Sequence, residues 1–426
     1  MSGSETTPAG PPATPSPGDL KARSRGVAVA ALVVSLAGYL VILVAAHALT
    51  PADNADFLSY WALLFLCSGV MGGIQSEATR AVHTTRRGAD PRRSTSPLAV
   101  GLGLGGAVAV MVLVTSPLWG TAVLGSDQWG LLAFVAVGAI GFAGHNAVVG
   151  TLAGNGRWTA FSWLLGGEAV ARLALTLVAA AAATMVPAQI GLPAAAAGAA
   201  LTWVAVIVWP RARAVREAAG TRVSGSAGDL ARRMGPAMIG AASSATLLVG
   251  FPVMLRLTTD GPEYALAAPL LLAVQVTRAP LMVPLGAFQG VAITHVLDHG
   301  AAALTKIGAI IVGIGAVGAG AAWLVGPWVM LIFGPEYRVP GGVLAGLTAG
   351  AATLALLTLS GAMTIALGRH RLFAVGWFVA AAVTILLLLV VPADAGTRAV
   401  VGLLTGPLVG VASHLVPTAR AWTGRH

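Results

Sequence analysis

The sequence has little charge and a single cysteine. Of its 426 residues only 9% are charged, 57% are hydrophobic, and the mean hydropathy is +0.84. A soluble domain carries about 25% charged residues, so the composition excludes a water-soluble globular protein. The lone Cys67 excludes an internal disulfide, a cysteine-based zinc site and an iron–sulfur cluster.

Several signatures of catalysis are also absent. The sequence has no GxxxxGK[ST] loop to hold ATP, no HExxH or His/Cys cluster to hold a metal, and no large loop with paired acids. Almost every residue falls in an apolar segment or a short loop, which leaves no room for a soluble catalytic domain. The sequence therefore predicts a protein that is not an enzyme and uses no cofactor.

Twelve segments are long and apolar enough to cross a membrane. A bilayer core of about 30 Å needs roughly 20 apolar residues in a helix. That window gives spans at 26–49, 57–79, 98–118, 129–153, 159–185, 190–209, 235–257, 264–291, 307–332, 339–367, 371–391 and 397–417. The prediction is an all-α polytopic membrane protein of about twelve transmembrane helices.

Lysine and arginine are distributed unevenly between the two sides of these spans. Twenty of the 25 lie in the two tails and in the loops after even-numbered spans, whereas the other side receives Arg256, Arg338 and Arg398. Cytoplasmic loops are enriched in both residues, so both termini are expected in the cytoplasm. The net charge of +10 then needs no nucleic-acid partner, because membrane lipids face these basic loops.

The chain divides into two similar halves. Gly156-Arg157 and Phe161 match Gly368-Arg369 and Phe373 at an offset of 212 residues. Pro51 and Pro262 are 211 residues apart, and Leu124-Gly125 and Phe333-Gly334 are 209 apart. The predicted organisation is a disordered cytoplasmic N-tail (1–25), a six-helix half (26–209), a cytoplasmic linker (210–234), a second six-helix half (235–417) and a cytoplasmic C-tail (418–426). Such pseudo-symmetric halves are typical of transporters that bind substrate between them.

Arg278 lies near the middle of the eighth span. An ionisable group at that depth costs about 2.5–3.5 kcal/mol, which makes it a candidate functional residue. Gln275 and Gln289 share the span, and Pro280 and Pro284 are expected to interrupt its hydrogen bonds. A guanidinium there suits a phosphate or pyrophosphate. The alternative is a structural arginine satisfied by backbone carbonyls that the kink frees.

Two further pairs of charges accompany apolar spans. Glu168 and Arg172 are four residues apart in the fifth span, so they are expected on one helix face. Either they form a structural ion pair, or Glu168 takes up a proton and releases Arg172 for substrate. Glu77 and Arg80 form a similar candidate pair at the cytoplasmic end of the second span, where Arg80 is a cavity-rim residue or a lipid anchor.

Short motifs along the chain resemble one transporter superfamily. The turn at 48–53 leading to Phe57 is similar to its "LGPeeFG" turn, and Phe333-Gly334-Pro335-Glu336-Tyr337 is similar to its "lfGpeY" segment. The segment 366–371 is similar to its "alGr.r" turn, and the spacing from Arg278 and Pro280 to Gln289 is similar to a pattern in its eighth span. The superfamily is the multidrug/oligosaccharidyl-lipid/polysaccharide (MOP) exporters, and the branch is the polysaccharide-biosynthesis (Wzx-like) flippases.

This resemblance implies a function and a set of partners. It implies a flippase in the bacterial cytoplasmic (inner) membrane that moves a polyprenyl-(pyro)phosphate-linked oligosaccharide to the outer leaflet by alternating access, together with envelope glycosyltransferases or a polymerase. Arg278, Arg172 and Arg80 are then the candidate phosphate ligands, with Glu168 and Glu77 in coupling or ion pairs. The alternatives are a multidrug or small-solute antiporter, for which the first span lacks a carboxylate, and a non-transporting scaffold for envelope assembly.

Overall fold

The computed structural model describes residues 17–86, 94–125, 128–299 and 301–423, and these are almost entirely helical. The elements are α1 (Pro17–Ala48), α2 (Pro51–Arg86), β1 (Ser94–Thr95), α3 (Pro97–Thr115), η1 (Ser116–Leu118), α4 (Gly120–Leu124), α5 (Gln128–Gly154), α6 (Trp158–Ala181), α7 (Ala188–Ala199), α8 (Thr202–Val208), α9 (Arg213–Ala219), β2 (Val223–Ser224), α10 (Ala227–Leu248), α11 (Phe251–Thr258), α12 (Gly261–Ala265), α13 (Ala268–His299), α14 (Ala301–Met330), η2 (Leu331–Phe333), α15 (Gly341–Ala366), α16 (His370–Val390) and α17 (Ala395–Thr423). The predicted all-α membrane class is confirmed.

Within the described residues, nine helices are long and apolar enough to cross a membrane, and two bent helix pairs bring the number to 11. The pairs are α7 with α8, bent by 50°, and α10 with α11, bent by 68°. The eighth predicted span corresponds to α13, which is described as an apolar helix over Ala268–Met282. The count of twelve spans stays a prediction.

The prolines in these apolar helices do not all have the same effect on the chain. Helix α13 continues through Pro280 and Pro284, so these prolines do not end the helix. Proline removes one hydrogen bond at each position, and neighbouring groups in a membrane bundle compensate for that loss. A sharp break lies at Gly250, two residues before Pro252, where α10 ends and α11 begins.

The repeated turns have the same local geometry. Gly156 and Gly368 have positive φ angles of 71° and 74°, which glycine adopts without a steric penalty. The next residue in each turn donates back to a helix carbonyl, from Arg157 N to Leu152 and from Arg369 N to Thr364. Both helices therefore end in the same left-handed cap, as expected if the two halves are duplicates.

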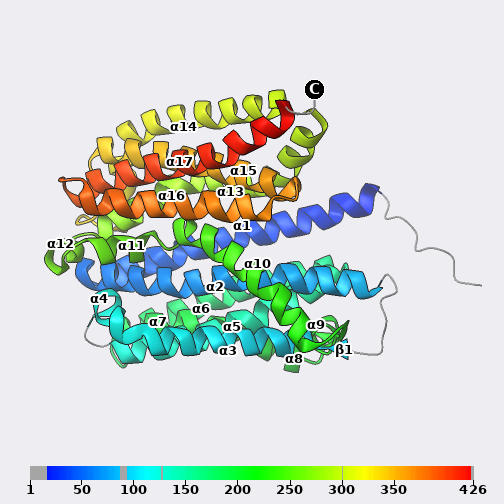
Figure 1. The fold of residues 1–426 in the computed structure, drawn as a ribbon. Helices are drawn as coiled ribbons and strands as arrows, with labels where there is room; N and C mark the ends of the chain where they lie inside the picture. The colour runs from blue at the N-terminus through cyan, green and yellow to red at the C-terminus, as the bar shows by residue number, and fades with distance from the viewer. Residues whose placement is uncertain (1–16, 87–93, 126–127, 300, 424–426) are drawn as a thin grey trace, which may run out of the picture.

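The helices form two bundles with α10 between them (Figure 1). Helices α2, α3, α5, α6 and α7 pack together on one side, and α13, α14, α15, α16 and α17 on the other. Helix α10, placed by sequence in the second half, crosses the molecule along α2 and also contacts α16. The segment between the halves is ordered, since β2 pairs antiparallel with β1 and Arg222 donates to Ser94.

The borders of the predicted tails differ from the helix ends. Helix α1 begins at Pro17, inside the predicted N-tail, and α17 continues to Thr423, inside the predicted C-tail. Proline is favourable at the first position of a helix because its missing N–H has no intrahelical partner there. Residues 1–16 and 424–426 lie outside the described residues.

Candidate functional site

Arg278 lies where α13 meets the break between α10 and α11. Its side chain is buried, and Nη1 donates to the carbonyls of Leu247 (3.2 Å) and Leu248 (3.1 Å). Its guanidinium carbon lies 5.9 Å from the centre of the Phe251 ring. The last carbonyls of a helix have no intrahelical partner and form the negative end of its dipole, so Arg278 caps α10.

This cap leaves part of the guanidinium unsatisfied. Nη2 of Arg278 is buried and has no hydrogen-bond partner in the described part of the chain. No described carboxylate forms an ion pair with it; the neighbouring polar group is Tyr39 of α1, whose hydroxyl donates to the carbonyl of Gln275 (3.1 Å). A buried charged donor without a partner costs at least about 1–3 kcal/mol. Arg278 is therefore an uncompensated cation with a free donor.

Arg172 has a different environment inside the first bundle. Its Nη2 lies 3.2 Å from Oε2 of Glu168, and both side chains are buried. The guanidinium also lies over two aromatic rings of α2, 4.7 Å from the centre of Phe65 and 5.6 Å from that of Trp61. The predicted ion pair is formed, and the charge of Arg172 is balanced by a carboxylate and two π faces.

Arg172 and Arg278 lie on different neighbours of α2 at a similar depth. Gly69 and Gly73 allow α10 to approach α2 closely, because a Cβ on either glycine would overlap Ala245 or Met238. Because Ala245 packs against Gly69, Leu247 lies near residues 65–69 of α2. Arg172 contacts the Phe65 ring at the same level of α2. The cations therefore occupy separate environments, one inside the first bundle and one at the junction with the second.

Of the remaining predicted residues, Arg80 and Glu77 lie apart from Arg278. Arg80 is exposed and pairs with Glu77 (2.8 Å), which also lies 3.8 Å from Arg233 of α10. Arg80 is 15 residues from Phe65, or about 22 Å along the helix axis, so one diphosphate does not reach both Arg80 and Arg172. Gln275 is half-buried one turn before Arg278, and the side chain of Gln289 lies outside the described residues.

Two tyrosines join the bundles at the end opposite α9, a feature that sequence reasoning missed. The hydroxyl of Tyr337 accepts from Asn54 of α2 (3.0 Å) and donates to the Ala46 carbonyl, and the hydroxyl of Tyr264 pairs with Ser59 of α2. All four side chains are buried. The signal was in the sequence, because both tyrosines end the same Gly-Pro-Glu-Tyr motif, at 261–264 and 334–337.

Solved structures with this fold are transporters. An inward-facing multidrug resistance MATE family transporter of the MOP superfamily superposes with a TM-score of 0.69 at 13% identity, over 92% of this chain and 98% of that chain. An outward-facing one gives 0.62 at 14% identity, over 95% and 96%. A MOP superfamily transporter from Pyrococcus furiosus, described by the reverse polarity of its binding pocket and a suggested different function, gives 0.62 at 14%, over 94% and 96%. The chain has the MATE transporter fold.

The sequence relatives are mycobacterial. No family model matches the chain. It is 39% identical over 401 residues to "Uncharacterized protein Rv3630" of Mycobacterium tuberculosis, covering 92% of this chain and 91% of that protein. It is 38% identical over 389 residues to "Uncharacterized protein Rv1510" of the same species, covering 90% and 88%. The chain belongs to the family of these proteins.

Proposed function

We propose that this protein is an alternating-access transporter for an anionic amphiphile. Its substrate is a polyprenyl-(pyro)phosphate-linked oligosaccharide, moved from the cytoplasmic to the outer leaflet of a bacterial inner membrane for envelope polysaccharide synthesis. The observation that carries this proposal is Arg278, a buried cation between the bundles with a donor left free. A phosphate oxygen supplies both the acceptor and the charge that this guanidinium lacks.

The closure of one end supports alternating access. Tyr264 and Tyr337 fasten the second bundle to α2 at the end opposite the arginine-rich loops. The protein also superposes with a higher TM-score on the inward-facing MATE structure than on the outward-facing one. In the proposed cycle, this state receives substrate from the cytoplasmic side, and breaking the tyrosine contacts opens the other side.

The Glu168–Arg172 pair is assigned a coupling role in this proposal. A buried carboxylate that holds a cation exchanges that partner when it takes up a proton, because the neutral acid no longer attracts the guanidinium strongly. Protonation of Glu168 would loosen the packing of α6 on Phe65 of α2. Helix α2 also carries the tyrosine contacts, so it links the pair to the closed end.

A multidrug antiporter is the second candidate, favoured by the multidrug resistance transporters among the structural neighbours. The two candidates differ in the charge of the substrate. An organic cation needs an acidic or aromatic site, and Arg278 repels it. An anionic lipid needs the arginine.

The experiment that tests the proposal measures the leaflet in which lipid-linked glycans reside. Depletion of the protein in its own host is expected to accumulate one such glycan on the cytoplasmic side, and Arg278→Ala is expected to reproduce that result. Arg278→Lys keeps the charge but not the paired donors, so we expect partial activity. Arg213→Ala is the control, because Arg213 is exposed on α9, where it pairs with Glu217 and contacts neither Arg278 nor the two tyrosines.

The outcomes separate the alternatives. An unchanged leaflet distribution, together with export of a cationic dye that Arg278→Ala does not impair, would establish the multidrug antiporter instead. An unchanged distribution with no dye export would favour a non-transporting scaffold. Membrane levels of each variant, measured on the same cells, separate loss of function from loss of folding.

A further inference from the structure

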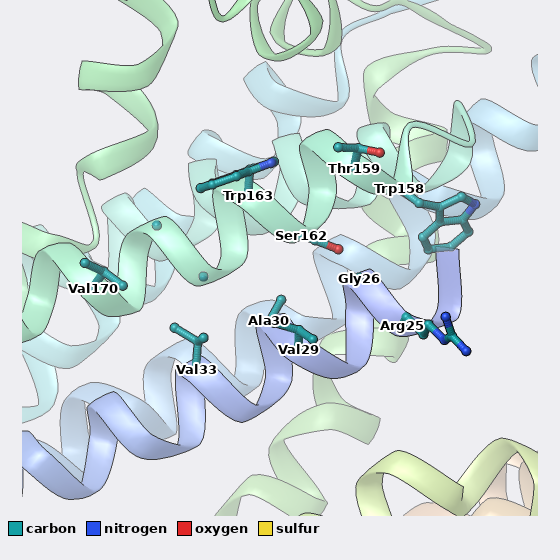
Figure 2. A pocket seen from close by; sticks show the side chains of 12 residues that line it. Arg25, Gly26, Val29, Ala30, Val33, Trp158, Thr159, Ser162, Trp163 and Val170 are labelled. Carbon is teal, nitrogen blue, oxygen red and sulfur yellow. The ribbon is translucent and has the colours of Figure 1, made fainter. Parts of the chain in front are cut away.

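A long apolar groove runs between α1 and α6 on the outside of the first bundle (Figure 2). Its volume is about 670 Å³. Val29 and Val33 of α1 and Val170 of α6 form its sides, and Trp158 lies at one end with Arg25. Val29 (63%) and Val170 (54%) are exposed, so the groove opens away from the bundle and towards the bilayer. The site is separate from Arg278 and independent of the proposed function.

The dimensions of the groove match one leaflet. On α6 it extends from Trp158 to Val170, twelve residues or about 18 Å of helix. Half of a bilayer core is about 15 Å. The groove thus reaches from one membrane interface to the centre of the bilayer, as a single lipid chain does.

Small residues form the floor of the groove. A Cβ on Gly166 would only touch Ala30 and Val33 at about 3.9 to 4.0 Å, and a Cβ on Gly167 would meet nothing within 4 Å. The absent side chains leave a slot between the helices where a linear hydrocarbon can lie. Thr159 and Ser162 are the polar residues of the wall. Ser162 Oγ is buried and lacks a hydrogen-bond partner in the described part of the chain.

The polar groups at the mouth indicate the headgroup. Arg25 is exposed at the end of the groove, beside Trp158. Tryptophan rings gather at the headgroup level of membranes, and arginine binds phosphate with paired donors. A phosphate at Arg25 therefore places an attached chain directly in the groove.

We propose that this groove binds one anionic phospholipid, with an acyl chain between α1 and α6 and its phosphate on Arg25. Phosphatidylglycerol fits both requirements, because its chain has the length of one leaflet and its headgroup carries net negative charge. Phosphatidylcholine has the same chains and no net charge, so comparing the two isolates the contribution of Arg25.

Native mass spectrometry of the purified full chain tests the proposal. With chain-matched lipids, we expect one phosphatidylglycerol to be retained at a several-fold lower concentration than phosphatidylcholine. Gly167→Leu fills the groove and is expected to abolish this retention. Arg25→Gln is expected to reduce phosphatidylglycerol to the level of phosphatidylcholine. Gly103→Leu on α3, which also adds a side chain in open space, is the control and is expected to bind as wild type.

Three results would overturn the proposal. The first is equal retention of the two lipids by the wild type. The second is a loss of binding in Gly103→Leu as large as in Gly167→Leu. The third is a preference for polyprenyl phosphate over phosphatidylglycerol that Gly167→Leu removes, because that result would assign the groove to a different lipid. Thermal stability of each variant in the same detergent verifies its folding.

Discussion

Two arginines at a similar depth in this protein are stabilised in different ways. Arg172 has a carboxylate, Glu168, and the faces of Trp61 and Phe65. Arg278 has two backbone carbonyls, at Leu247 and Leu248, and no described carboxylate. Burial alone therefore does not identify a functional cation. The difference in charge compensation identifies Arg278 as the candidate, because of these two arginines only Arg278 combines an unpaired charge with a free donor at the junction of the bundles.

The largest expected effect on stability comes from breaking the compensated pair. Arg172→Ala leaves Glu168 buried without its partner, and such a change costs about 3–5 kcal/mol. Arg278→Ala leaves only two carbonyls unpaired and is expected to cost about 1–3 kcal/mol. Thermal unfolding of both variants in detergent measures the difference. The double variant Glu168→Gln, Arg172→Gln is expected to recover much of the loss; a double variant as unstable as Arg172→Ala would contradict the pairing.

The packing of α10 on α2 bears on the comparison of Arg172 with Arg278, because it positions the carbonyls of α10 that Arg278 contacts. A Cβ on Gly73 would lie 2.3 Å from the backbone nitrogen of Met238. Gly73→Ala must push the helices apart, and overpacking of this kind costs about 1–3 kcal/mol. Gly72→Ala is the matched control, because a Cβ there meets nothing within 4 Å. Equal thermal stability of the two variants would show that the helices do not pack this closely.

Removing the hydroxyls of Tyr264 and Tyr337 is expected to have a smaller effect, on the equilibrium between the closed and open arrangements of the two bundles. Tyr264→Phe and Tyr337→Phe each remove hydrogen bonds between the bundles worth about 1 kcal/mol, or roughly a fivefold change in an equilibrium. Spin labels at Met185→Cys and Val390→Cys, in a Cys67→Ala background, report the separation of the bundles by pulsed electron resonance. We expect more of the open state in both tyrosine variants.

The control for the tyrosine variants lies within one bundle. The hydroxyl of Tyr60 is buried and donates to the carbonyl of Pro193 of α7, so it joins two helices of the same bundle. Tyr60→Phe should leave the distance distribution between the two labels unchanged. If it opened the molecule as much as Tyr337→Phe does, the tyrosines would not act as a lock between the bundles.

The smallest effect concerns an exposed pair with the same spacing as Glu168 and Arg172. Glu217 accepts from Arg213, four residues before it, and from Arg157. These hydrogen bonds hold the pKa of Glu217 below its ordinary value, and the one from Arg213 contributes most. A carboxylate whose pKa is lower in the folded protein stabilises the fold at pH values above its unfolded-state pKa of about 4.3. This stabilisation is lost as the pH falls through the folded-state pKa.

The measurement for this pair is thermal stability as a function of pH. Glu217→Gln is expected to be slightly less stable than wild type at pH 7 and equal to it at pH 3, because exposed pairs contribute little. A difference between the two proteins that grew as the pH fell would reverse the expected sign. It would mean that the protonated form of Glu217, and not the carboxylate, is stabilised in the folded protein.

Local features of this protein were predictable from the sequence. The apolar spans follow from composition, and the Glu168–Arg172 and Glu77–Arg80 pairs follow from helical spacing. The bend before Pro252 follows from a glycine and a proline close together. Each of these features depends on residues within a few positions of one another.

Features that depend on distant residues were not predictable. The partners of Arg278 lie about 30 residues away, in a different helix, so its depth could be predicted but not what it contacts. Tyr337 binds Asn54 across 283 residues of sequence. The close packing of α10 on α2 at Gly69 and Gly73 is likewise a property of the assembled bundle.

Direct binding of a short-chain polyprenyl diphosphate to the purified protein tests the central claim most directly. We expect the wild type to bind it, Arg278→Gln to lose at least tenfold in affinity, and Arg172→Lys, which retains the charge next to Glu168, to bind as wild type. That result would assign the anion to the uncompensated arginine. Binding that survives Arg278→Gln unchanged would contradict the account, because Arg278 would then be only the cap of α10.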